Sequence, residues 1–86
     1  MSKQPFEQIK PEQLKDLNFL EAQHGGYNYH AEIRQTMQDN WALDIYLVDD
    51  SKKCWNEFSR VYRTAKAALK KLKEYWKGDA VEWRLL

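Results

Sequence analysis

Three side chains in this sequence are of the types that bind transition metals or act as nucleophiles: His24, His30 and Cys54. Imidazole nitrogens and a thiolate are usual zinc ligands, and a cysteine beside a histidine can act as a nucleophile. Their spacing matches no standard zinc motif, and the chain has no glycine-rich phosphate loop, no G-x-S-x-G and no H-E-x-x-H. We therefore expect no enzymatic activity, no catalytic or metal-binding residues and no cofactor, and we expect Cys54 to be a small buried side chain.

A second group of residues is strongly basic. Residues 51–77 contain nine lysines and arginines against two glutamates. If this segment is helical, part of this charge gathers on about a quarter of the circumference and forms a candidate basic docking face. Its members are Lys52, Arg63, Lys66, Lys70, Lys73 and Lys77. Such a stripe is typical of phosphate binding, but it is also what a solvated lysine-rich helix shows, and it could be a surface for an acidic protein.

The first fifty residues have the opposite character, with nine acidic side chains against four basic ones. Glu21, Glu32 and Asp44 form a candidate acidic face that could bind a basic patch on another protein, with ordinary solubility as the alternative. Near the other end, aromatic and aliphatic residues form a candidate C-terminal interface, because such side chains often anchor protein contacts. They are Tyr75, Trp76, Trp83 and Leu85.

Alternating apolar residues predict the strands that must position these groups. Alternation over residues 27–34 and again over residues 41–48 predicts an antiparallel hairpin. The Gly25-Gly26 pair predicts a turn before it. Pro11 predicts a short helix over residues 11–17. Residues 18–23 could extend this helix or form a strand that makes the hairpin a three-stranded meander.

Residues 51–77 are predicted to form a long amphipathic helix. Apolar residues from Trp55 to Trp76 advance by alternating steps of three and four. Asp49 and Ser51 could cap its start, and Gly78 could end it. The predicted fold is one α+β domain over residues 11–86, after a flexible N-terminus of residues 1–10. It has a short N-terminal helix, the hairpin or meander, this long helix packed on one sheet face, and a short C-terminal strand or docked tail.

Composition indicates a small cytoplasmic protein. The chain has 86 residues, a net charge of +1, a single cysteine and 14% aromatic residues, and it has no apolar run long enough to span a membrane. Its segregated charge is similar to that of small accessory proteins of phage or mobile elements. We expect a non-enzymatic interaction module, of adaptor or inhibitor type, that acts by contact with a protein partner or by self-association as a dimer. The alternative is a nucleic-acid-binding domain that uses the basic docking face.

Overall fold

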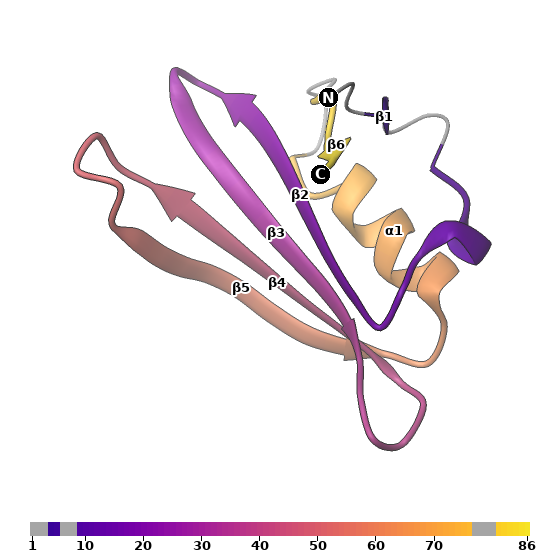
Figure 1. Ribbon diagram of the computed structural model, residues 1–86. Helices are drawn as coiled ribbons and strands as arrows, with labels where there is room; N and C mark the ends of the chain where they lie inside the picture. The colour runs from indigo at the N-terminus through magenta and orange to yellow at the C-terminus, as the bar shows by residue number, and fades with distance from the viewer. Residues whose placement is uncertain (1–3, 6–8, 77–80) are drawn as a thin grey trace.

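The structure is a computed structural model that describes residues 4–5, 9–76 and 81–86. Within these residues, one antiparallel sheet of six strands has a single α-helix on one of its faces (Figure 1). The strands lie in the order β1-β6-β2-β3-β4-β5. In chain order the elements are β1 (Gln4–Pro5), a 3₁₀ helix (Pro11–Gln13), β2 (Leu17–His24), β3 (Tyr27–Gln35), β4 (Trp41–Val48), β5 (Cys54–Tyr62), α1 (Ala65–Lys73) and β6 (Arg84–Leu85).

The four long strands, β2 to β5, form a meander in which each strand pairs with the next. The β2–β3 turn consists of Gly25 and Gly26, whose φ angles are 60° and 82°. A two-residue hairpin turn of this kind needs positive φ at both positions, which glycine adopts at little cost. The turn and the hairpin predicted from the sequence are therefore confirmed, and the undecided segment of residues 18–23 is a strand.

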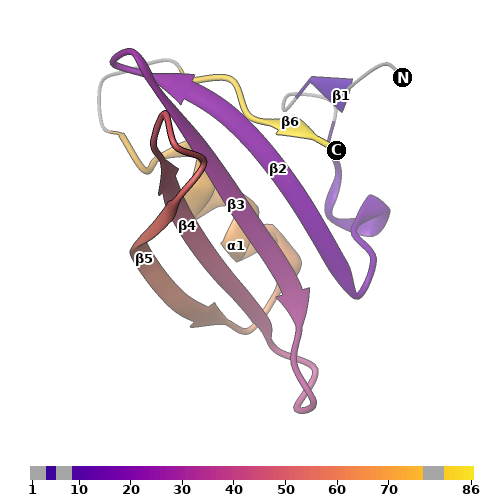
Figure 2. The ribbon, with the colours of Figure 1, turned by 60° about the vertical axis from the view of Figure 1, so that its left-hand side comes forward.

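The core lies between the sheet and α1. Figure 2 shows the curved strands with α1 behind them, so the opposite face of the sheet is not covered by the helix. The fully buried aliphatic side chains of the strands point toward α1: Leu20, Ile33, Leu43 and Ile45. Ala68 and Leu72 of α1 and Trp83 of the C-terminal segment pack against them. Below, "open face" means the side of β2 to β5 that α1 does not cover.

The helix predicted over residues 11–17 is reduced to the 3₁₀ helix Pro11–Gln13. The chain leaves the helical path because of Asn18, a buried side chain at the start of β2. Its Oδ1 accepts a hydrogen bond from the Lys15 backbone N–H at 2.8 Å, and its Nδ2 donates to the carbonyl oxygens of Lys15 and Ile33 at 2.7 and 3.1 Å. These bonds hold the chain in a tight entry to the sheet, because a buried amide needs such partners.

The prediction of a long helix over residues 51–77 is wrong, and so is the α+β architecture built on it. Most of the fold is antiparallel sheet, residues 54–62 are strand β5, and α1 has only nine residues. The long basic amphipathic helix therefore does not exist. Asp49 and Ser51 form a loop instead of a helix cap, and the N-cap of α1 is Thr64, whose Oγ1 accepts a hydrogen bond from the Ala67 N–H at 3.1 Å.

A β-bulge explains why β5 looks helical in the sequence. Tyr46 lies opposite Asn56 and Ile45 lies opposite Phe58, so Glu57 is an extra residue in the strand. An extra residue shifts the strand's alternation by one. Trp55, Phe58 and Tyr62 consequently fall on the same side at spacings of three and four, which is also the helical spacing.

Candidate functional site

The register of the strands determines which side chains meet on the open face. Residues directly opposite each other in an antiparallel sheet project to the same side. Glu32 of β3 lies opposite Asp44 of β4, and each has a further neighbour, Phe19 of β2 and Ser59 of β5. The result is a row across four strands with two carboxylates side by side at its centre.

This carboxylate pair is electrostatically unfavourable. Like charges directly opposite each other in a sheet repel, at a cost of roughly 0.2–1 kcal/mol. The Ser59 hydroxyl donates a hydrogen bond to Asp44 Oδ1 at 2.5 Å. The pKa of the Tyr46 hydroxyl, on the same face, is raised by burial first and then by the charges of Asp44 and Glu32. Two carboxylates therefore lie at the centre of the open face, and the charge of Arg34 on the same face acts on the pKa of Tyr46 in the opposite direction.

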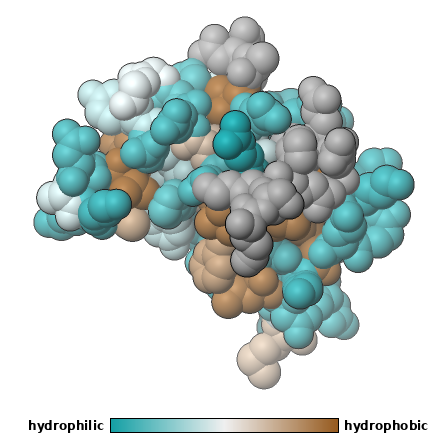
Figure 3. Space-filling view, turned by 45° about the horizontal axis from the view of Figure 1, so that its top comes forward, coloured by the Kyte–Doolittle hydropathy of each residue, from teal (hydrophilic) through white to brown (hydrophobic). Residues whose placement is uncertain are grey.

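Exposed apolar side chains lie beside the carboxylates. Leu17, Phe19 and Val61 are 48%, 51% and 55% exposed. Leu17 and Val61 are the two ends of a row across the open face that also contains Arg34 and Ala42. Figure 3, which views the molecule from another side, shows hydrophobic patches separated by hydrophilic side chains rather than one large apolar surface. The open face thus combines apolar contact area with an acidic centre.

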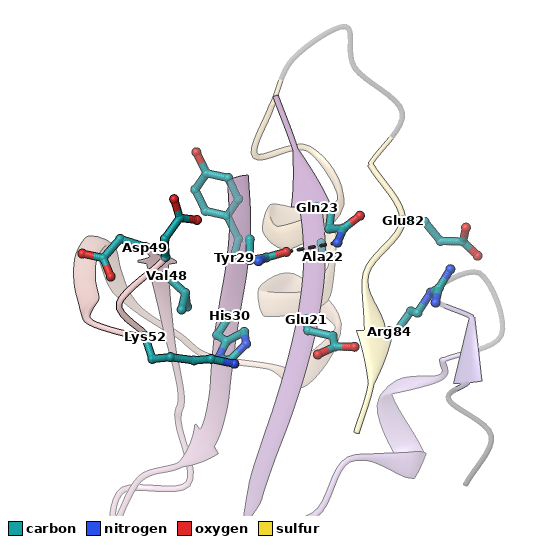
Figure 4. Close-up of a pocket in the computed structure, with 12 residues that line it drawn as sticks. Glu21, Ala22, Gln23, Tyr29, His30, Val48, Asp49, Lys52, Glu82 and Arg84 are labelled. Atoms are coloured by element: carbon teal, nitrogen blue, oxygen red, sulfur yellow. Dashed lines mark hydrogen bonds between the residues drawn. The ribbon is translucent and has the colours of Figure 1, made fainter. Parts of the chain in front are cut away.

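At the β2–β3 turn, the sheet and the neighbouring loops enclose a hollow of about 630 Å³ (Figure 4). His30 and charged side chains of both signs line it, the charged ones being Glu21, Asp49, Asp50, Lys52, Glu82 and Arg84. Arg84 of β6 lies opposite Glu21 of β2, and Gln23 Nε2 donates a hydrogen bond to Asn28 Oδ1 at 3.1 Å. Of the candidate acidic face, Glu21 therefore lines this hollow, while Glu32 and Asp44 form the central pair.

Asp49 organises the loop on one side of this hollow. Its Oδ1 accepts hydrogen bonds from the Ser51 N–H, the Ser51 hydroxyl and the Lys53 N–H at 2.9, 2.7 and 2.9 Å. The bond with the Ser51 side chain, followed by that with the Lys53 backbone, lowers the pKa of Asp49. The loop holds Lys52 at a positive φ of 67°, and the Lys52 side chain extends toward His30 (Figure 4).

The candidate basic docking face is not one continuous surface. Lys52 lies in the loop before β5 and Arg63 directly after β5, so a nine-residue strand, roughly 30 Å long, separates them. Three more members are exposed on α1: Lys66, Lys70 and Lys73. Lys77 lies outside the described residues. The geometry that motivated nucleic-acid binding, a stripe of six cations on one helix, is therefore absent.

The three candidate metal-binding side chains, His24, His30 and Cys54, lie in different parts of the molecule. His24 stacks on Trp76 with 4.5 Å between ring centroids, on the helix side, whereas His30 lies on the open face. Cys54 is exposed at the start of β5, so the prediction that it is buried is wrong, because that prediction placed it on a helix. Among the described residues, no cluster of histidine, cysteine or acidic side chains has a geometry that could hold a metal ion.

The candidate C-terminal interface residues pack within the chain. Trp83 is completely buried, and Tyr75, Trp76 and Leu85 are partly buried against the same core. Trp76 stacks on Trp83 with 5.7 Å between ring centroids. These side chains hold the C-terminal segment against the sheet.

One further site, which the sequence does not indicate, lies on the helix side. Tyr29, Glu57, Tyr75 and Trp76 line an open hollow of about 500 Å³, here called the aromatic pocket. The bulge in β5 places Glu57 there, and no sequence signal connects β3, β5 and the end of α1. Burial raises the pKa of the Tyr75 hydroxyl, and the charge of Glu57 and their hydrogen bond raise it further.

No family model, no curated protein and no solved structure matches this chain. Within the described residues, no helix is both long and apolar enough to cross a membrane.

Proposed function

We propose that this protein is a non-enzymatic interaction module, of adaptor or inhibitor type, whose open face binds a basic surface of another protein. The observation that carries the proposal is the Glu32–Asp44 pair, two carboxylates directly opposite each other on the open face. A basic partner would neutralise both charges and turn their repulsion into attraction. An ordinary solvated surface gains nothing from such a pair, because isolated charges keep a protein soluble equally well.

The residues around the carboxylate pair add apolar contact area, which the two charges alone do not provide. Phe19 lies next to Glu32 in the same row and is half exposed, so it can contribute apolar contact area to an interface. Aromatic side chains of this kind commonly supply much of the binding energy, while charges contribute specificity and association rate. The combination favours a protein surface with arginine or lysine next to an apolar patch.

Nucleic acid is a weaker candidate as partner. The carboxylates of the open face repel phosphates, and the remaining exposed lysines of α1 are only three: Lys66, Lys70 and Lys73. We place the protein in the cytoplasm as part of the proposal, because an exposed free thiol such as Cys54 is best kept reduced there.

A titration with a defined basic ligand tests the proposal. The probe is a ten-residue peptide that alternates arginine and leucine, with a glutamate-and-leucine peptide as the control ligand. The test variant is Glu32→Gln/Asp44→Asn, and the matched control is Glu12→Gln/Glu74→Gln, which removes the same charge from exposed sites elsewhere. We expect the first variant to bind the basic peptide about tenfold more weakly and the second to change affinity less than about twofold.

Two outcomes separate the possibilities. Equal losses in both variants would show that net charge alone attracts the peptide, and would overturn the proposal.

Sedimentation of the unliganded chain tests self-association independently. A dimer that the Glu32→Gln/Asp44→Asn variant abolishes would identify a second copy of this chain as the basic partner, with the exposed lysines of α1 as the complementary surface.

A further inference from the structure

We propose that the outer edge of β5 binds an acidic, extended segment of another protein as an additional strand of the sheet. The outer edge is the side of β5 that faces away from β4. β5 is the last strand of the sheet, and among the described strands it pairs with β4 alone (Figure 1). The carboxylates Glu32 and Asp44 lie on the two central strands and not at this edge. The proposal therefore does not rest on the function proposed above, and either can fail without the other.

The hydrogen bonds at the two ends of β4 show which way the backbone groups of β5 point. The Thr36 N–H donates to the Asn40 carbonyl oxygen at 2.7 Å, and the Asp49 N–H donates to the Lys53 carbonyl oxygen at 3.0 Å. Hydrogen-bonded and non-hydrogen-bonded pairs alternate along an antiparallel ladder. Both bonds give the same alternation, in which the even-numbered residues of β4 bond to β3 and the odd-numbered ones bond to β5.

Four residues of β5 therefore direct their N–H and C=O groups outward. They are the residues opposite the even-numbered positions of β4, namely Cys54, Asn56, Ser59 and Val61. Over residues 4–5, 9–76 and 81–86, no other backbone or side-chain group bonds to these eight backbone groups. An edge of this kind can accept the ladder of a further strand, which is how several peptide-binding domains hold their ligands.

The two ends of the sheet differ as binding edges. At one end, β1 has only two residues, and one of them is Pro5, which has no N–H to donate. At the other end, β5 has nine residues and no proline. Short strands and proline are common ways to keep other chains from a sheet edge. Of the two terminal strands that the structure describes, β5 is thus the one that remains open to pairing.

Charge determines which strand fits this edge. Residues 52–63 contain four basic side chains and one acidic one: Lys52, Lys53, Arg60, Arg63 and Glu57. Lys53 Nζ lies 4.6 Å from the ring centroid of Trp55, and the guanidinium carbon of Arg60 lies 5.6 Å from that of Tyr62, so aromatic rings hold both cations beside the strand. Two copies of this edge repel each other, which disfavours pairing with a second copy of the chain. A strand with carboxylates is attracted instead.

The side chains of β5 also define the pattern of the incoming strand. Residues opposite each other in an antiparallel pair project to the same side. Lys53 and Arg60 both lie on the helix side, opposite Asp49 and Leu43, and are therefore roughly 20 Å apart along the strand. Val61 lies on the open-face side and is 55% exposed. A segment that alternates acidic and apolar residues places carboxylates beside both cations and an apolar side chain beside Val61.

The glutamate-and-leucine peptide, which is the control ligand for the open face, is the probe for this edge. It is titrated into isotope-labelled protein, and the exchange rates of the Ser59 and Val61 amide hydrogens are followed by NMR. We expect saturable binding with a Kd on the order of 100 μM. Exchange at both amides should become at least about tenfold slower, because new ladder hydrogen bonds protect them. The arginine-and-leucine peptide should slow neither amide, because the cations of the edge repel it.

Matched variants separate strand pairing from charge attraction. Val61→Pro removes an outward N–H without removing a bond to β4, whereas Val61→Thr keeps the N–H and the branched shape. We expect the first to weaken binding of the probe at least about tenfold and the second less than about twofold. Arg60→Gln should weaken it about threefold, and Lys66→Gln, at an exposed position of α1, should leave it unchanged. Glu32→Gln/Asp44→Asn, the test variant of the open face, should not weaken it.

A probe with all its backbone amides N-methylated keeps the charges and side chains but cannot donate ladder hydrogen bonds. It is tested on the wild type, so the result does not depend on the folding of a variant. Equal binding of this peptide, or unchanged exchange at Ser59 and Val61, would overturn the proposal. The absence of binding at probe concentrations on the order of 5 mM would overturn it as well.

Two further results would assign the edge to another occupant and would also overturn the proposal. The first is tighter binding of a thymidine decamer than of the probe, which would identify single-stranded nucleic acid as the ligand. The second is a dimer in sedimentation that Val61→Pro abolishes and Val61→Thr preserves, which would identify a second copy of the chain.

Discussion

The two faces of the sheet are built from the same four strands, but the residues on them are under different physical constraints. On the helix side, the central positions are occupied by aliphatic side chains that are fully buried, such as Ile33 and Leu43. On the open face, the neighbouring positions of the same strands carry Glu32 and Asp44, which repel each other. Close packing restricts the helix side to apolar side chains that fill the core. The open face, in contrast, can carry two neighbouring carboxylates although their repulsion lowers the stability of the fold. The open face is therefore where selection for binding can act.

The largest expected effect tests the packed face. Leu43→Ala leaves a cavity at a fully buried position and should lower the free energy of unfolding by about 3 kcal/mol. Phe19→Ala, on the half-exposed open face, should cost less than about 1 kcal/mol although it removes more atoms. Urea denaturation followed by circular dichroism measures both values. Equal losses for the two variants would show that the faces do not differ in the way described.

The next effect concerns the one buried polar side chain of the described core, Asn18. Asn18→Leu keeps the approximate size of the side chain and removes its three hydrogen bonds with Lys15 and Ile33. Backbone groups left without partners cost roughly 1–3 kcal/mol, so we expect a loss of about 2 kcal/mol in the same denaturation experiment. A neutral or stabilising substitution would mean that Asn18 does not determine how the chain enters β2.

The smallest effect is a pH dependence in the loop between β4 and β5. The pKa of Asp49 is lowered in the folded protein by its hydrogen bonds, so the ionised carboxylate favours folding. This contribution is fully present above the pKa of an unfolded aspartate, about 4, and is lost as the pH falls through the lower folded pKa. The stability difference between the wild type and Asp49→Asn should therefore shrink between about pH 6 and pH 2. A difference that stays constant over this range would contradict the role assigned to Asp49.

The sequence predicted those strands whose alternation is regular. β3 and β4 each have one face in the core, and their period of two is visible without the structure. β5 was missed because the extra residue Glu57 changes its spacing to one that a helix also shows. Composition contained a clue: residues 54–62 include three aromatic side chains and one valine, whereas the nine residues of α1 are alanine, leucine and lysine only.

The candidate sites could not be predicted from the alternation of apolar residues, because they depend on strand register and on contacts between segments distant in the sequence. Glu32 and Asp44 could be assigned to the polar sides of their strands, but their direct opposition follows from the β3–β4 register. The loop Thr36–Asn40 fixes that register through the bond from the Thr36 N–H to the Asn40 carbonyl oxygen at 2.7 Å. The aromatic pocket was beyond prediction, because Glu57 and Tyr75 meet only when the chain beyond α1 returns to the bulge of β5.

The central claim is that the acidic pair of the open face is kept for binding at the expense of stability. The most direct test is the thermal stability of Glu32→Gln/Asp44→Asn, measured beside the Glu12→Gln/Glu74→Gln control at low salt. Removing the repulsion should raise the free energy of unfolding by roughly 0.5–1 kcal/mol, because the amide oxygen of the asparagine that replaces Asp44 can still accept the Ser59 hydrogen bond. The control should stay within about 0.5 kcal/mol of the wild type. A destabilised Glu32→Gln/Asp44→Asn protein would show that the carboxylates support the fold, and would contradict the account.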